Sequence, residues 1–177
     1  MRQVHKFTSD EKLKSWGYGE WVEEPDEVTF THNGLDCRIV RVSAIGKPDP
    51  MYGGHLCGYV RIPENHPHFR DHYDDIPIEV HGGLTYSEEE KHGYWIGFDC
   101  AHSFDYSPSI EYLRNTLPEL IKIANDYKEL KKKIGVERCE EFEPTYKNIS
   151  FAIGECKSMA DQLVELKNTC LKKKSIY

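Results

Sequence analysis

Hydrophobic and polar positions alternate through the first half of the chain, as is typical of β-strands that bury one face. The alternation continues on both sides of Asn33-Gly34, a pair of residues that favours a tight hairpin turn. The pattern predicts strands at 27–32, 35–43, 56–62, 76–86 and 94–102. Loops are predicted at 46–54 and 63–77, where prolines interrupt the pattern.

The period changes to three and four residues in the second half, which indicates helices. Ser107-Pro108 is a typical helix start, and the predicted helix continues to Gly135 with an interruption or restart at Pro118. An acidic connector at 137–144 precedes a long amphipathic helix, predicted over about 145–173. One or two further helical turns are predicted at 10–16.

Strands that precede helices, rather than alternate with them, indicate an α+β fold. We therefore predict an antiparallel β-meander of about five strands packed against C-terminal helices. The length suits a single domain over residues 1–177, mainly β over 1–106 and helical over 107–177.

Composition narrows the classes of function. A formal net charge of −7 and a pI near 5.7 argue against a protein that coats duplex nucleic acid. No apolar stretch is long enough for a signal peptide or a membrane span, so we expect a cytoplasmic protein. Six cysteines without a CxxC pair are expected to be buried, reduced thiols rather than zinc ligands.

Two adjacent glycines, Gly82 and Gly83, interrupt the fourth predicted strand, and glycine inside a strand often marks a close approach. If this strand pairs with the fifth around a loop centred near residue 90, Tyr86 lies opposite Tyr94 and Gly83 lies opposite Gly97. The same register predicts a bare backbone trough between the strands. It holds only if the pairing is not shifted, because a shift by one residue exchanges the faces.

The trough has two predicted walls. Trp95 forms one, and His81 and Asp99, directly opposed and able to share a hydrogen bond, form the other. The predicted ligand-binding residues are Arg61, His81, Gly82, Gly83, Tyr86, Trp95, Gly97, Asp99, His102 and Asp105.

Eight of these candidates have a predicted role toward a nucleotide-derived ligand. Trp95 or Tyr86 would stack on a base, and the amides of Gly82 and Gly83, with Arg61, would take phosphate. The side chains of His81, Asp99 and His102 would read polar groups.

A metal site is the alternative for part of this set. Asp99, His102 and Asp105 carry oxygen and imidazole donors that suit Mn, Fe or Zn. Their spacing matches no strict metal signature, so the preferred interpretation contains no metal ion and no other cofactor. Cys100 alternates with Asp99 along the strand and is therefore expected in the core.

Three segments carry a resemblance to a known family: GYVRIPENHP, HYDDIPIEVHGGLTY and WIGFDCAHSFD. Over residues 58–105 the chain resembles an uncharacterised family found largely in phage and prophage genomes. It departs from that pattern at SFD, where a small residue and glycine would precede Asp105. The resemblance implies no established activity. By analogy with small phage proteins, it suggests sequestration of a nucleotide-derived immune signal in the cytoplasm of a bacterial host.

Three functions are therefore compared. The first is a binding protein for a nucleotide-like small molecule. The second is a hydrolase or lyase of a phosphoester or glycosidic bond, with His81 as general base oriented by Asp99 and with His102 and Asp105 as acid or metal ligands. The third is a protein-interaction module that forms a homo-oligomer through the last helix. None of the three involves duplex nucleic acid or a membrane.

Overall fold

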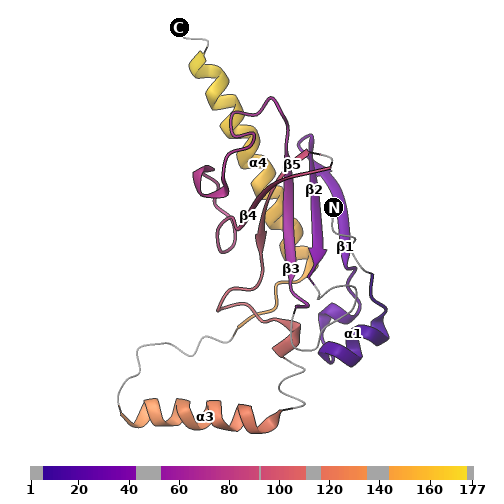
Figure 1. Ribbon diagram of the computed structural model, residues 1–177, viewed down its shortest axis with the longest axis vertical. Coiled ribbons are helices and arrows are strands. Elements are labelled where there is room, and N and C mark those ends of the chain that lie inside the picture. Colours follow the sequence, from indigo (N-terminus) through magenta and orange to yellow (C-terminus); the bar gives the residue numbers. More distant parts are fainter. Residues whose placement is uncertain (1–5, 43–52, 92, 111–116, 135–143, 175–177) are drawn as a thin grey trace.

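The computed structural model describes residues 6–42, 53–91, 93–110, 117–134 and 144–174. Within these residues, five antiparallel strands form one sheet, and a long C-terminal helix lies across one face of it (Figure 1). The predicted α+β class is confirmed.

The five strands are β1 (Glu27–His32), β2 (Leu35–Arg41), β3 (Leu56–Ile62), β4 (Tyr86–Glu90) and β5 (Gly93–Asp99). Their spatial order is β1-β2-β3-β5-β4. The sheet therefore follows the chain as a meander through β3, after which β5 takes the inner position and β4 becomes an edge strand.

The β1–β2 hairpin forms where the Asn-Gly pair predicts it. Asn33 and Gly34 have φ angles of 47° and 79°, both in the left-handed region that a tight hairpin turn of this kind requires. The strands predicted at 27–32 and 56–62 have the predicted bounds, whereas β2 ends at Arg41 and residue 43 lies outside the described part of the chain.

Helix α4 (Ile149–Lys174) packs its apolar stripe against β2 and β3. Five stripe residues have no exposed surface: Ala152, Cys156, Met159, Ala160 and Leu163. Gly58 on β3 permits the close approach, because a Cβ atom there would lie 2.4 Å from the Phe98 ring and 2.7 Å from Cys156 Sγ. This stripe is buried within the chain, so self-association through α4 would have to use its other faces.

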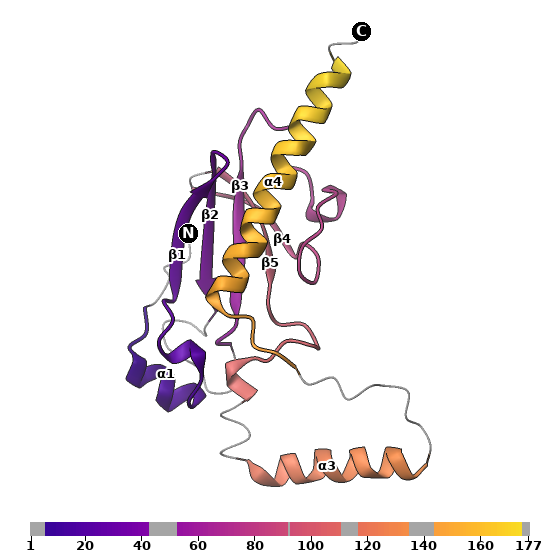
Figure 2. The same cartoon turned by 180° about the vertical axis from the view of Figure 1, so that it is seen from behind.

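Two smaller parts complete the fold. Helix α1 (Ser9–Trp16) begins with a capping box between Thr8 and Glu11 and, with the short 3₁₀ helix η1 (Glu20–Val22), forms a second small core. Helix α3 (Pro118–Lys133) begins at the predicted restart and lies away from the sheet in both views (Figures 1 and 2). Residues 111–116 of the predicted helix, most of the predicted 137–144 connector and most of the 46–54 loop lie outside the described residues.

The strand predicted at 76–86 is wrong for most of its length, since β4 begins only at Tyr86. Two residues before it, Glu79 and His81, bond side chains of α4 through their backbone instead of a neighbouring strand. The Gln162 amide accepts from the Glu79 N–H and donates to the Glu79 carbonyl, both at 2.8 Å, and the His81 N–H donates to Glu155 at 2.7 Å. The alternating pattern here reflects burial of Ile76 and Ile78 in the core, without strand pairing.

The predicted register of the last hairpin is also wrong. Tyr86 lies opposite Gly97 rather than Tyr94, a shift of three residues. An odd shift exchanges the faces of β4, so Tyr86 shares the outer face with Gly97. The faces of β5 follow the predicted alternation: Tyr94, Ile96 and Phe98 belong to the core.

The 63–77 loop, which contains the short 3₁₀ helix η2 (Tyr73–Asp75), is fastened to α4 through His66. The buried His66 ring bonds the Leu163 carbonyl through Nε2 (2.9 Å) and accepts the His68 N–H at Nδ1 (3.2 Å). The ring is therefore neutral, with its proton on Nε2. Burial lowers the pKa of His66 below its usual value.

We expect this histidine to make the protein less stable in mild acid. The folded-state pKa is lowered, so the unfolded chain binds the proton more readily, and stability is lost as the pH falls from about 6.5 through the folded-state pKa. Chemical denaturation of wild type and His66→Gln at neutral and mildly acidic pH measures this. The free energy of unfolding should fall more with acidification in wild type; equal losses would contradict the expectation. Among the described residues His55 is also buried, but it is present in both proteins, so its contribution cancels in the comparison.

Candidate functional site

The predicted site residues fall into two groups. Arg61, Tyr86, Trp95 and Gly97 lie on the outer face of the sheet, and His81, Gly82, His102 and Asp105 lie together beyond the end of β5. Asp99, the last residue of β5, lies beside the second group, with its Oδ1 3.9 Å from His102 Nδ1.

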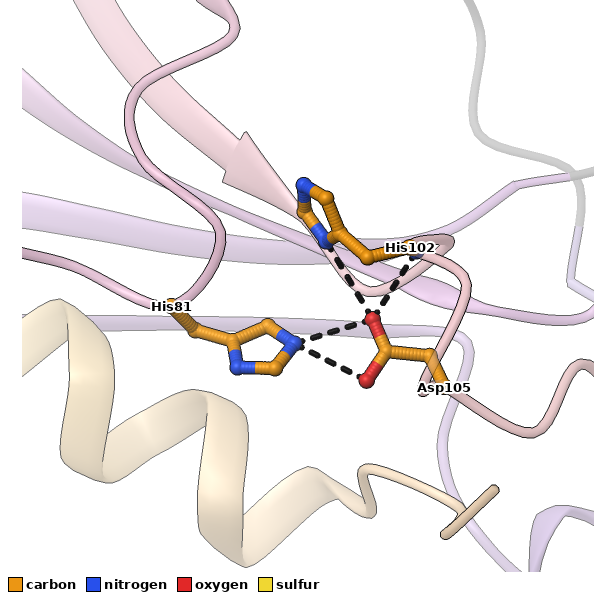
Figure 3. Close-up of side chains that lie close together, drawn as sticks. All are labelled: His81, His102 and Asp105. Atoms are coloured by element: carbon orange, nitrogen blue, oxygen red, sulfur yellow. Dashed lines mark hydrogen bonds and ion pairs between the residues drawn. The ribbon is translucent and has the colours of Figure 1, made fainter. Parts of the chain in front are cut away.

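Asp105 is the centre of the second group (Figure 3). His81 Nε2 lies 2.9 Å from both of its carboxylate oxygens, and His102 Nδ1 lies 3.2 Å from Oδ2. The backbone N–H of His102 also donates to Oδ2, at 3.0 Å. The Asp105 side chain has no exposed surface, whereas 11% of the His81 side chain and 23% of the His102 side chain are exposed. The carboxylate is therefore buried beneath two imidazoles that reach toward solvent.

The backbone around Asp105 is held on both sides. Its N–H donates to the His102 carbonyl at 2.9 Å, which closes a turn between these two residues. An isolated parallel bridge joins it to Thr145: the Tyr106 N–H donates to the Thr145 carbonyl (3.0 Å), and the Thr145 N–H donates to the Phe104 carbonyl (3.2 Å). The segment that leads into α4 therefore positions the carboxylate.

His81 is fixed by its backbone bond to Glu155 and by aromatic edges. The rings of Phe104 and Phe151 meet it nearly perpendicularly, with centroids 5.3 Å and 5.1 Å away. Such T-shaped contacts restrict the orientation of a ring. Its donor nitrogen is consequently directed at Asp105.

His102 explains why a glycine is found at position 82. Its ring stacks on Phe104, with centroids 5.6 Å apart. A Cβ atom on Gly82 would lie 1.9 Å from the His102 Cε1 atom and 2.1 Å from Nε2, and Gly82 also has a positive φ of 67°. A glycine is therefore required at position 82, because any larger residue would clash with the His102 ring.

The neighbouring Gly83 has a different environment. Its N–H donates to the Val80 carbonyl at 2.9 Å, so this amide is already engaged. A Cβ atom at Gly83 would meet nothing within 4 Å, and its φ of 86° is positive. The chain beside His81 is therefore open to an incoming molecule.

The surrounding charges are mixed. Lys147 Nζ lies 3.9 Å from Asp105 Oδ1 and 5.4 Å from the centroid of the Phe151 ring. Asp99 accepts from Thr85 Oγ1 (2.8 Å) and from the Ala101 N–H (3.1 Å). An anionic group and a cation therefore both lie next to the buried Asp105.

Nearby thiols do not supply a nucleophile. Burial raises the pKa of Cys57 to about 12 and also raises the pKa of Cys100, so both stay protonated near neutral pH. Cys100 is 2% exposed and belongs to the core, as predicted. The reactive groups here are therefore the imidazoles and the carboxylates.

Among the described residues, the group that could hold a metal ion is His81, His102 and Asp105, whose donor atoms lie within 4.8 Å of one another. The same three residues can also move protons, because each imidazole is oriented by a carboxylate. Of the predicted metal ligands, His102 and Asp105 belong to this group, whereas Asp99 lies beside it.

The predicted pair of His81 with Asp99 is wrong: His81 is hydrogen-bonded to Asp105. The predicted trough is also wrong, because Gly83 lies in a loop and does not face Gly97. On the outer face, the Arg38 guanidinium lies over the Trp95 ring at 4.9 Å and over the Tyr59 ring at 5.0 Å. The Trp95 face predicted to stack on a base is therefore covered by an arginine.

The other predicted residues on this face have protein partners. Arg61 pairs with Asp36 at 2.6 Å, and the Tyr86 hydroxyl donates to Glu90 at 3.0 Å. Their assignment as ligand-binding residues stays a prediction, separate from the Asp105 group.

Gly97 packs against Tyr59, and we expect Gly97→Val to destabilise the protein. An added Cβ would lie 2.4 Å from the Tyr59 ring and 2.7 Å from the Gly58 carbonyl oxygen, which belongs to rigid backbone. Overpacking of this kind typically costs about 1–3 kcal/mol. A lower midpoint in urea denaturation would show it. An unchanged or higher midpoint would mean that the space over Gly97 is free, as a ligand trough requires.

Two residues that build this site were not predicted from the sequence. Lys147 precedes α4 and Glu155 belongs to it, and both are far from the strands in sequence. The available signal was the flank of α4, where the polar residues Glu155 and Gln162 recur seven residues apart, two helical turns, beside the buried stripe.

Comparison with protein-family models, curated proteins and solved structures finds no significant match to this chain. The resemblance to a phage family therefore stays a prediction. No described helix combines the length and apolar character needed to cross a bilayer.

Proposed function

We propose that the protein is a hydrolase or lyase that cleaves a phosphoester bond in a nucleotide-derived small molecule. The observation that carries the proposal is the buried Asp105 carboxylate, which holds two partly exposed imidazoles in place. A buried carboxylate behind a histidine is the usual device for orienting a general base.

The geometry favours His102 as that base, in place of the predicted His81. Its Nδ1 faces Asp105, which leaves Nε2 on the far side of the ring (Figure 3). A Cβ atom on residue 82 would lie 2.1 Å from this Nε2, so the glycine keeps that space free. Nε2 can accept a proton from water while the water oxygen attacks phosphorus. The protonated imidazole then returns the proton to the leaving oxygen, so the ring is unchanged after one turnover.

An anionic substrate is favoured by the neighbouring cation. The Lys147 side chain is 17% exposed and lies at the edge of the Asp105 group. The open space at Gly83 provides an approach on the side of His81. A phosphate group can use both features, and the flat rings of Phe104 and Phe151 offer apolar contacts for the rest of the molecule.

Sequestration of the same class of ligand is the second candidate. The aromatic rings around His81 favour it, since they offer contact area without any chemical step. The two functions differ in the fate of the ligand. A binding protein releases it intact after denaturation, whereas an enzyme releases product.

The test is incubation of the purified chain with cyclic dinucleotides, linear dinucleotides and ADP-ribose derivatives, with chromatography of the mixture after denaturation. It is run both with a chelator and with added divalent ions. We expect a cleaved product from at least one compound. A thermal shift with full recovery of intact ligand would support sequestration instead. The absence of both product and thermal shift across the panel would rule out both functions for these ligands.

A further inference from the structure

The donor atoms of His81, His102 and Asp105 converge between the loop before β4 and the loop after β5 (Figure 3). We infer that these three side chains bind one divalent transition-metal ion. The inference rests on the proposed function for the reaction that the ion would assist, but the binding of the ion can be measured without any substrate.

The separations between the Asp105 carboxylate and the two imidazole nitrogens suit a shared ion. With metal–ligand bonds of about 2.1 Å, two ligands of one ion lie about 3.0 Å apart at a right angle and about 3.4 Å apart in a tetrahedron. Asp105 Oδ2 lies 2.9 Å from His81 Nε2 and 3.2 Å from His102 Nδ1. An ion can therefore replace the two imidazole protons with small side-chain shifts.

The three ligands are ordered by contacts that do not involve the ion. Glu155 accepts the His81 N–H, Phe104 stacks on the His102 ring, and the bridge to Thr145 fixes the backbone of Asp105. Side chains that are already in place lose little conformational freedom on binding, which favours affinity.

The local charge favours a cation. The carboxylates of Asp99 and Glu155 lie beside the Asp105 group, and Lys147 provides one opposing positive charge. Three carboxylates against one ammonium leave a net negative charge next to partly buried donors, where electrostatic attraction is stronger than in water. A divalent ion compensates this excess.

The donor types select the class of ion. Two imidazole nitrogens with one carboxylate are typical of Fe(II), Mn(II), Co(II) and Zn(II), whereas Ca(II) and Mg(II) prefer sets of oxygen ligands. Three protein ligands leave coordination positions for water and substrate, as in catalytic sites rather than closed structural ones. An ion in this position would take the Nδ1 lone pair of His102 and leave the ring proton on Nε2, so that a water molecule on the ion would replace His102 as the base. The ion would lower the pKa of that water and polarise a phosphoryl oxygen.

The alternative is that His81, His102 and Asp105 bind no ion and are held together by hydrogen bonds alone. In that case His81 and His102 keep the protons that they donate to Asp105, and added ions find no set of free donors. The two cases differ in saturable binding and in its dependence on each of the three residues.

The experiment is calorimetric titration of the chelator-treated chain of residues 1–177 with Mn(II), Co(II) and Zn(II), with visible absorption as a second readout for Co(II). We expect one ion per chain and a higher melting temperature on binding. His102→Gln and Asp105→Asn should weaken binding by more than about 100-fold, because even residues that only support a ligand cost 10–100-fold. If Asp105→Asn does not fold, the binding measured for His102→Gln tests the inference, because the His102 side chain is partly exposed and its replacement should preserve the fold.

His68→Gln is the matched control, since His68 Nδ1 also pairs with a carboxylate, Asp71, at 2.9 Å. This variant should bind the ion like wild type. No saturable binding by wild type, or equal binding by His102→Gln, overturns the inference. Turnover without ion binding would support the proposed function and contradict the metal site. Ion binding without turnover of any compound would support the metal site and contradict the proposed function.

Discussion

Replacement of Arg41 by methionine is expected to lower the free energy of unfolding by about 3–5 kcal/mol, the usual cost of removing one partner from a buried ion pair. The Arg41 side chain has no exposed surface, and it pairs with two carboxylates, Asp26 and Glu24, the first of which also pairs with the buried Lys12. Methionine retains much of the apolar stem, so the loss measures the charge and its hydrogen bonds. A domain of this size has a total stability of about 5–15 kcal/mol, so the effect is large.

Arg41 joins parts of the chain that are far apart in sequence. It donates to Asp26 and Glu24 before β1, to the Gly54 carbonyl before β3, and to the Tyr146 hydroxyl before α4, at 2.6–2.9 Å. Glu24 in turn accepts the first N–H of α4, that of Ile149. Loss of the guanidinium removes four hydrogen bonds that join these three segments. Asp26 keeps the Phe7 N–H and the Lys12 ammonium, and Glu24 keeps the Tyr146 hydroxyl and the Ile149 N–H.

Arg61→Met is the control for this prediction. Arg61 also pairs with an aspartate, Asp36, but both side chains are more than 40% exposed. Exposed pairs contribute about 0–1 kcal/mol. Urea denaturation of both variants and wild type gives the comparison. A loss for Arg41→Met no larger than that for Arg61→Met would show that the buried network does not stabilise the fold.

The parts of the fold that the sequence predicts correctly depend on local signals. Asn33-Gly34 specifies its turn through the φ angles that these residues tolerate, and the two adjacent strands follow from alternation. The apolar stripe of α4 is equally local, because its period belongs to one helix. Strand pairs and helices of this kind need no information from distant residues.

The segment before β4 shows why the rest could not be predicted. Residues 76–80 alternate like a strand, yet the backbone groups of Glu79 and the N–H of the following His81 bond side chains of α4, more than seventy residues later. A glutamine amide that pairs with both backbone groups of Glu79 imitates a neighbouring strand. The pattern of apolar and polar residues in one sequence does not reveal such a partner. A paired strand and an unpaired extended segment therefore have the same pattern.

The candidate site depended on the same register. The sequence included His81, Gly82, His102 and Asp105 among its candidates, and the structure brings these four together beyond the end of β5. It assigned the wrong carboxylate to His81, since pairing shifted by three residues and β4 was shorter than predicted. Residue types near a turn can thus be selected from sequence, while their pairing requires the three-dimensional path of the loops.

His102→Gln should reduce turnover of any compound that the wild-type protein cleaves by about 10²–10⁴-fold, the usual contribution of a positioned general base. Glutamine keeps a polar group of similar reach but cannot accept and return a proton. Because the His102 side chain is 23% exposed, we expect the melting temperature to change far less than activity.

The comparison with His68→Gln separates catalysis from the mere loss of an imidazole–carboxylate pair. His68 bonds Asp71 as His102 bonds Asp105, at 2.9 Å and 3.2 Å, but it lies on the loop after β3 and outside the Asp105 group. This variant should keep wild-type kcat and KM. If both variants lose activity to the same degree, the effect is structural. If His102→Gln retains wild-type kcat while His81→Gln does not, the base is His81, and the substrate approaches from the open space beside Gly83.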